Sequence, residues 1–116
     1  MDLSIDSKTD ELVYLRIDGD IRGRFPSDPT KLLTELLGKD AYKNRVLLSF
    51  EDVKYVDSNG LAWLVVCHKR FSEGGGALVL HTLPEVVRNV MKIVRLDQVF
   101  LLAENADEAG KIAMAQ

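Results

Sequence analysis

The sequence predicts a single α/β domain in which a mixed sheet of four to five strands is covered by about four helices. Segments with an apolar residue at every second position are typical of strands, and segments whose apolar residues recur every three to four positions are typical of amphipathic helices. The two patterns alternate along the chain, as they do in α/β proteins. Its 116 residues can form one core without disulfides or metals, so we expect one domain over residues 1–116.

The composition excludes several classes of protein. With 47% hydrophobic and 28% charged residues, the chain matches neither a disordered tail nor a membrane protein. The formal net charge of -3 argues against a nucleic-acid partner, because such proteins usually carry a basic excess. Residues 1–6 lack the basic region and apolar core of a signal peptide, and Cys67 is predicted to be a buried thiol. We expect a cytoplasmic protein with no direct contact to nucleic acid and no membrane insertion.

The first segments predict a hairpin at the edge of the sheet. Apolar and polar residues alternate over residues 3–5 and again over 13–17, with a turn at 8–10 between them. Gly19 ends the second strand, and a loop over residues 22–28 follows.

A helix is predicted after this loop. Asp28 suits its N-cap, and Pro29 suits the first helical position, where a missing N–H costs nothing. Four leucines then form an apolar stripe before Gly38 ends the helix: Leu32, Leu33, Leu36 and Leu37. The apolar run from Arg45 to Phe50 predicts a central strand.

The apolar run from Leu61 to Cys67 predicts a buried helix with Ser58 at its N-cap. Core packing explains three of its residues: Leu61, Leu64 and Val65. By the helical period, Trp63 and Val66 point elsewhere, so they either pack against a neighbouring helix or form a partly exposed patch that docks a partner.

The last third of the chain predicts two strands and two helices. Residues 74–76, all glycine, form a turn into a strand over 77–81, and 100–102 form a short last strand. Thr82 and Glu85 have the spacing of a capping box, which opens a helix with four inward residues: Val86, Val87, Val90 and Met91. Asn105 and Glu108 cap a terminal helix that packs through Ala109, Ile112 and Ala113.

The stretch Val56-Asp57-Ser58-Asn59-Gly60-Leu61 joins the central strand to the buried helix. A hydroxyl at the positive end of a helix, beside a carboxylate and a glycine, suits a site that is modified by phosphate. Gly60 would let another chain's backbone approach closely. Judged on the residue alone, a simple helix cap is the plainer interpretation of Ser58.

Several pieces of the sequence, in this order and spacing, resemble the STAS domain of bacterial anti-sigma factor antagonists. They are Gly19-Asp20-Ile21, Asp57-Ser58-Asn59-Gly60-Leu61, Gly74-Gly75, Ala77 to Leu80 and Leu83-Pro84. The resemblance covers nearly the whole chain. It departs from the family pattern at a basic, bulky loop, Arg22 to Pro26, and at Asn59, where Ser or Thr is common.

The resemblance implies a regulatory binding protein. In that family the Ser after the Asp, here Ser58, is phosphorylated by the anti-sigma factor, an ATP-dependent serine kinase, and restored by a serine phosphatase. The unphosphorylated domain would bind the kinase and release the sigma factor, and ATP and Mg would belong to the partner, so the chain needs no cofactor. The expected partner-binding residues are Asp57, Ser58, Asn59, Gly60, Leu61 and Trp63, with Asp20 and Arg22.

Two other interpretations compete with this one. In the first, the chain is an accessory STAS subunit of a larger complex, such as a lipid-transport ATPase, in which Ser58 only caps the helix and apolar surface around Trp63 is permanently buried. In the second, Ser58 is the nucleophile of an enzyme. We expect no enzyme, because His68 lies three turns along the same helix, roughly 15 Å away, and Val56 breaks the Gly-x-Ser-x-Gly pattern. Two histidines and one cysteine at these spacings make no metal site.

Overall fold

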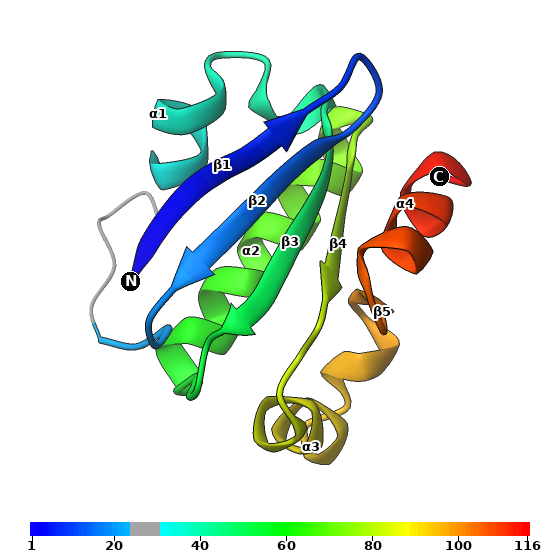
Figure 1. Ribbon diagram of the computed structural model, residues 1–116. Helices are drawn as coiled ribbons and strands as arrows, with labels where there is room; N and C mark the ends of the chain where they lie inside the picture. The colour runs from blue at the N-terminus through cyan, green and yellow to red at the C-terminus, as the bar shows by residue number, and fades with distance from the viewer. Residues whose placement is uncertain (24–30) are drawn as a thin grey trace.

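The computed structural model describes residues 1–23 and 31–116. A five-stranded mixed sheet with the order β1-β2-β3-β4-β5 confirms the predicted fold class (Figure 1). β1 pairs antiparallel with β2, and the other neighbours are parallel. The elements are β1 (Asp2–Lys8), β2 (Val13–Asp18), α1 (Lys31–Leu37), η1 (Ala41–Lys43), β3 (Arg45–Asp52), α2 (Ser58–Gly74), β4 (Ala77–His81), α3 (Glu85–Ile93), η2 (Leu96–Gln98), β5 (Leu101–Ala103) and α4 (Ala106–Met114).

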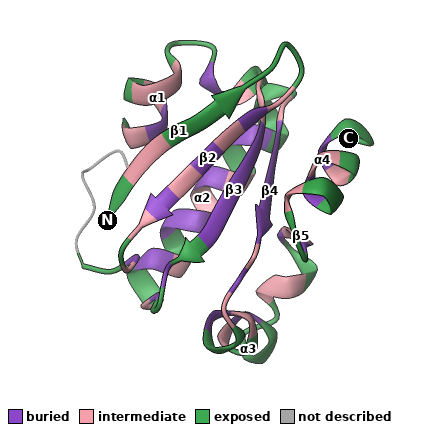
Figure 2. Cartoon of the chain, viewed as in Figure 1, coloured by how far each residue is buried: buried purple, intermediate pink, exposed green. Residues whose placement is uncertain are grey.

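The helices cover the two faces of the sheet unequally. The larger core contains Leu33 of α1, Trp63 and Leu64 of α2 and Met91 of α3, which pack on one face. On the other face, α4 is the one described helix that packs on the sheet. It forms a smaller core with three strand residues, and the members of this core are Leu47, Val79, Ala103, Ala109 and Ala113. The buried residues of β3, β4 and the inner side of α2 lie together at the centre of the molecule (Figure 2).

The hairpin of β1 and β2 forms one edge of the sheet, as predicted. Val13, Leu15 and Ile17 of β2 alternate toward the larger core because successive strand residues point to opposite faces. In β1 the register shifts between Ile5 and Ser7, so Asp6 is an extra residue that bulges from the ladder.

Three predicted helix ends are confirmed, one of which is Gly38, which follows the last residue of α1 with φ of 86°. Asn105 caps α4, because its side chain accepts a hydrogen bond from the N–H of Glu108 at 2.9 Å. Gly75, with φ of 86°, ends α2 in the left-handed conformation that glycine adopts without strain. The predicted opening of the first helix at Asp28 and Pro29 lies outside the described residues, as does the 24–28 part of the preceding loop.

The prediction for α3 is partly wrong. Thr82 makes no capping box: its φ is 57°, its hydroxyl lies 2.8 Å from Nδ1 of His81, and Pro84 occupies the N-cap without a side-chain hydrogen bond. The helix begins at Glu85, and only Val87 and Met91 of the four predicted inward residues are buried. The other two are Val86, which is 60% exposed, and Val90, which is half-buried.

Candidate functional site

The start of α2 is capped by Asp57, not by Ser58 as predicted. Oδ1 of Asp57 accepts a hydrogen bond from the N–H of Gly60 at 2.7 Å, and its carbonyl oxygen accepts the first helical bond from Leu61 at 2.9 Å. A carboxylate is as good an N-cap as a hydroxyl, and Asp57 has the extended backbone that this position needs. Ser58 is therefore the first residue of the helix. Its side chain is exposed, and its hydroxyl has no hydrogen bond to any residue in the described ranges.

Asp57 also joins the helix start to the segment that follows β2. Oδ2 of Asp57 accepts a hydrogen bond from the N–H of Gly23 at 3.0 Å, and the N–H of Asp57 donates to the carbonyl of Ile21 at 3.1 Å. Ile21 in turn donates to the carbonyl of Tyr55 and forms a parallel bridge with Val56. The two segments therefore lie side by side at the carboxyl end of β3 (Figure 1).

These bonds set the charge of the site. The hydrogen bond from Gly23, followed by that from Gly60, lowers the pKa of Asp57 below its ordinary value, since each favours the ionised carboxylate. The Asn59 N–H and the Arg22 cation act in the same direction, and partial burial opposes them. The residue before Ser58 is thus a carboxylate at neutral pH.

Gly60 is a packing position and not a contact for another chain. It is buried, and a Cβ atom there would overlap the carbonyl oxygen of Ile21 and lie 2.9 Å from Cγ1 of Val56. The backbone that approaches this glycine closely belongs to Ile21 of the same chain. The absence of a side chain at Gly60 lets the loop after β2 pack against the first turn of α2.

The structure brings most of the predicted partner-binding residues to one place. Ser58, Asn59 and Arg22 are exposed, and three others are half-buried: Asp57, Leu61 and Asp20. Sequence reasoning missed Tyr55, an aromatic side chain that is 48% exposed in the same loop. An aromatic residue between Lys54 and Val56, two positions before the cap, was the available signal.

Trp63 is not a surface residue, which corrects its place among the partner-binding residues. Its exposure is 1%, and it lies in the larger core with Gly60, Leu64, Cys67 and Phe71 on the buried face of α2. Of the three residues predicted to pack in the core, Leu64 is buried, whereas Leu61 and Val65 are half-buried against the larger core. Trp63 is the largest side chain on this buried face, and of the two alternatives left open for it, the partly exposed docking patch is wrong.

Nothing described near Ser58 resembles catalytic machinery. His68 packs its ring against Phe100, with 6.0 Å between ring centroids, and His81 is bonded to Thr82. Burial lowers the pKa of both imidazoles. Within residues 1–23 and 31–116, no three His, Cys, Asp or Glu side chains are grouped to hold a metal ion, and no helix is long and apolar enough to cross a membrane.

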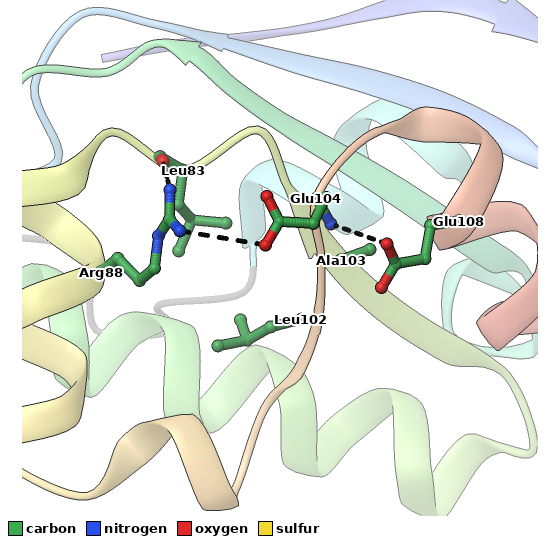
Figure 3. Close-up of a pocket in the computed structure, with 6 residues that line it drawn as sticks. All are labelled: Leu83, Arg88, Leu102, Ala103, Glu104 and Glu108. Atoms are coloured by element: carbon green, nitrogen blue, oxygen red, sulfur yellow. Dashed lines mark hydrogen bonds and ion pairs between the residues drawn. The ribbon is translucent and has the colours of Figure 1, made fainter.

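A small pocket lies between α3 and the start of α4 (Figure 3). Its polar groups already satisfy one another: Arg88 donates to the carbonyl of Leu83 at 3.3 Å and lies 3.9 Å from Glu104, whose N–H donates to Glu108. The cavity volume of about 100 Å³ is well below that of ordinary small-molecule sites. The pocket is therefore a weaker candidate site than the exposed turn at Ser58.

Comparisons with known proteins match nearly the whole chain. A family model described as the STAS domain matches residues 5–109. A solved structure from Thermotoga maritima, of a protein provisionally described as an anti-sigma factor antagonist, has 22% sequence identity and a TM-score of 0.77, with 97% of this chain and 93% of that chain covered.

Two structures of the anti-sigma factor antagonist SpoIIAA are also similar. The unphosphorylated form has 14% identity and a TM-score of 0.66, with 98% of each chain covered. The phosphorylated form of this Bacillus cell fate determinant has 14% identity and a TM-score of 0.59, with 96% of this chain and 99% of that chain covered. At such identities the likeness to these structures establishes the fold.

Proposed function

The chain belongs to the STAS domain family, and from this premise we propose that it is a regulatory binding protein of the anti-sigma factor antagonist type, switched by reversible phosphorylation of Ser58. One observation is the main support. The Ser58 hydroxyl is exposed on the first turn of α2, while the cap is supplied by its neighbour Asp57. A serine that is not needed as a cap can be modified without removing a hydrogen bond on which the helix depends.

The charge of the site makes phosphate an effective switch. A phosphate adds about two negative charges at a helix N-terminus, where free N–H groups and the helix dipole stabilise anions. The fold therefore tolerates it. A partner docked over this turn would have to bury the phosphate beside the Asp57 carboxylate, and a like-charge juxtaposition of this kind costs several kcal/mol, or more than a hundredfold in affinity.

The similarity to SpoIIAA supports this proposal, because that protein exists in phosphorylated and unphosphorylated forms. By analogy, the partner here is an anti-sigma factor serine kinase that holds the ATP, and a serine phosphatase reverses the modification. The chain acts by binding and not by catalysis, needs no cofactor of its own, and works in the cytoplasm.

The alternative role, as an accessory subunit of a transport complex, has lost its main support. It required apolar surface around Trp63 that is buried in a permanent complex, whereas Trp63 already lies in the domain's own core. We therefore prefer the switched binding protein.

Intact-mass measurement of the protein from its native cells, with peptide mapping across residues 56–69, tests the proposal. We expect one phosphate on Ser58 that is absent from the Ser58→Ala variant. The unmodified protein should retain a partner that Ser58→Asp loses, while Ser72→Asp, an equal charge at an exposed serine on the same helix, should retain it. A chain that remains unmodified in growth and stress and purifies as a constant complex would refute the switch.

A further inference from the structure

Helix α3 has apolar side chains on its outer side as well as on its inner side. Val87 and Met91 face the core, with exposures of 1% and 0%. Val86 and Ile93 lie seven residues, or two turns, apart on the other side, with exposures of 60% and 80%, and Val94 after the helix end is 48% exposed. Ile93 is the most exposed large apolar residue of the described chain.

Basic side chains border these aliphatic residues. Lys92 and Arg95 flank Ile93 and Val94 in the sequence, are exposed, and form no ion pair with any described residue. Arg88 on the same helix is different, because Glu104 and the carbonyl of Leu83 occupy its guanidinium. A chain of net charge -3 thus has a local apolar surface with a basic border at the Ile93 end, while the exposed Glu85 adjoins Val86 at the other end.

We propose that this α3 patch, made of Val86, Ile93, Val94, Lys92 and Arg95, binds an amphipathic helix of a partner protein whose apolar stripe is bordered by Glu or Asp. Its apolar area, on the order of 300 Å², is in the range of the largest patches on monomeric proteins, which are often functional. The two-turn spacing of Val86 and Ile93, about 10 Å, matches the spacing of apolar anchors along a partner helix. The free cations Lys92 and Arg95 complement acidic side chains at its border.

An anionic membrane fits these residues less well than a protein does. Stable attraction to anionic lipid headgroups takes a cluster of about four to eight cations or a lipid anchor. The α3 patch has two unpaired cations, on a chain whose overall charge repels such a surface. The inference is separate from the Ser58 switch, because it uses no residue of the α2 start.

A synthetic amphipathic helical peptide with leucines on one face and glutamates at its border is a suitable probe. Titrated into the isotope-labelled full chain, it should give saturable shifts of the methyl signals of Val86, Ile93 and Val94. A matched peptide with lysine in place of each glutamate should give none. Absence of saturable shifts with the acidic peptide, or shifts centred elsewhere, would overturn the proposal.

Variants make the test specific. Ile93→Ser should weaken binding of the acidic peptide by at least about tenfold, as loss of a central anchor does. Ile5→Ser, which removes another exposed isoleucine on β1, should leave the affinity unchanged. The double variant Lys92→Glu with Arg95→Glu should lose the acidic peptide and gain the lysine peptide. A double variant that keeps the original preference would exclude the charge complementarity.

Sedimentation with vesicles of phosphatidylglycerol and phosphatidylcholine tests the lipid surface directly. We expect the chain to stay in the supernatant. Sedimentation that depends on Lys92 and Arg95 would assign the α3 patch to a membrane and overturn the protein partner. Because neither experiment depends on Ser58, a failure here leaves the phosphorylation proposal standing, and the reverse is also true.

Discussion

The carboxylate of Asp57 and the backbone N–H of Gly23 form a 3.0 Å hydrogen bond between segments 34 positions apart in the sequence. The other oxygen of the same carboxylate caps α2 through Gly60. One side chain therefore fixes both the helix start and the neighbouring loop, directly beside Ser58. A partner that docks on this turn, as proposed, would meet the two segments as one preformed surface, which would reduce the entropy lost on docking.

Replacement of Asp57 by Asn should separate these two roles. An amide has a single acceptor oxygen, and Asn is a good N-cap, so the bond to Gly60 should remain and the bond to Gly23 should break. Hydrogen exchange followed by NMR should show the Gly23 amide exchanging on the order of tenfold faster, with the Gly60 amide still protected. Unchanged protection of both amides would contradict the double role.

Acid should remove the contribution of Asp57 to stability. Hydrogen bonds, first from Gly23 and then from Gly60, hold its pKa below the ordinary value of 3.8. A carboxyl whose pKa is lower in the folded chain stabilises the fold above its unfolded pKa, and this is lost as the pH falls through the folded pKa. In urea titrations, the difference in unfolding free energy between the wild type and Asp57→Asn should be constant near neutral pH and shrink below about pH 4. A difference that widens in acid would be inconsistent with this assignment.

Gly60→Ala should destabilise the domain, although alanine normally favours a helix. The new methyl group would collide with Ile21 and Val56, and such overpacking typically costs about 1–3 kcal/mol. Gly110→Ala in α4 is the matched control, since its Cβ would meet Leu12 at an ordinary 3.5 Å, and it should stabilise by up to about 1 kcal/mol. Urea unfolding of both variants measures the difference. Equal effects of the same sign would show that close packing at Gly60 is unimportant.

Trp63, the chain's one tryptophan, reports on the core directly. Because it is 1% exposed, native fluorescence should be blue-shifted and resistant to acrylamide quenching, and it should shift to the red on unfolding. Trp63→Ala should lower the free energy of unfolding by about 3–5 kcal/mol, as truncation of a buried aromatic residue does. Emission typical of water-exposed tryptophan in the folded protein would disprove this burial.

Ser58→Asp should leave the fold intact. An acidic residue in the first turn interacts favourably with the helix dipole, so the free energy of unfolding should stay the same or rise by about 0.3–1 kcal/mol. Thermal and urea unfolding test this expectation independently of any partner. A loss of more than about 1 kcal/mol would mean that the hydroxyl has a structural role and that a lost partner cannot be ascribed to charge alone.

The edge hairpin, the mixed sheet and most element boundaries could be predicted from the sequence, because buried positions recur with the period of a strand or a helix. The alternation in β2, the apolar run of β3 and the Asn105 cap each depend on residues close together in the chain. Where two neighbours are equally suited to one role, this local information fails. Asp57 and Ser58 are both good caps, and the distant Gly23 amide satisfies the second oxygen of Asp57.

The errors in α2 and α3 have the same origin in tertiary contacts. A capping box needs Thr82 in extended conformation, but Thr82 adopts a positive φ and lies within hydrogen-bonding distance of His81. Periodicity gives an apolar helix several possible inner faces, and the fit against the sheet selects the one with Trp63. The Ser58 turn is a site that the sequence alone predicts, whereas its pairing with Ile21 and Gly23 could be seen only in the fold.

The bulge at Asp6 affects how readily copies of this protein can pair through the edge strands of their sheets at high concentration. An edge strand of seven residues offers unpaired backbone groups from which a fibril could grow. The extra residue at Asp6 interrupts the ladder, and such a bulge bends the strand and increases its twist, so β1 is a poorer template for a second strand than a regular one would be. At the other edge, β5 is only three residues long. Both edges of the sheet are thereby poor templates for a further strand, which disfavours association of copies of this protein through their sheet edges.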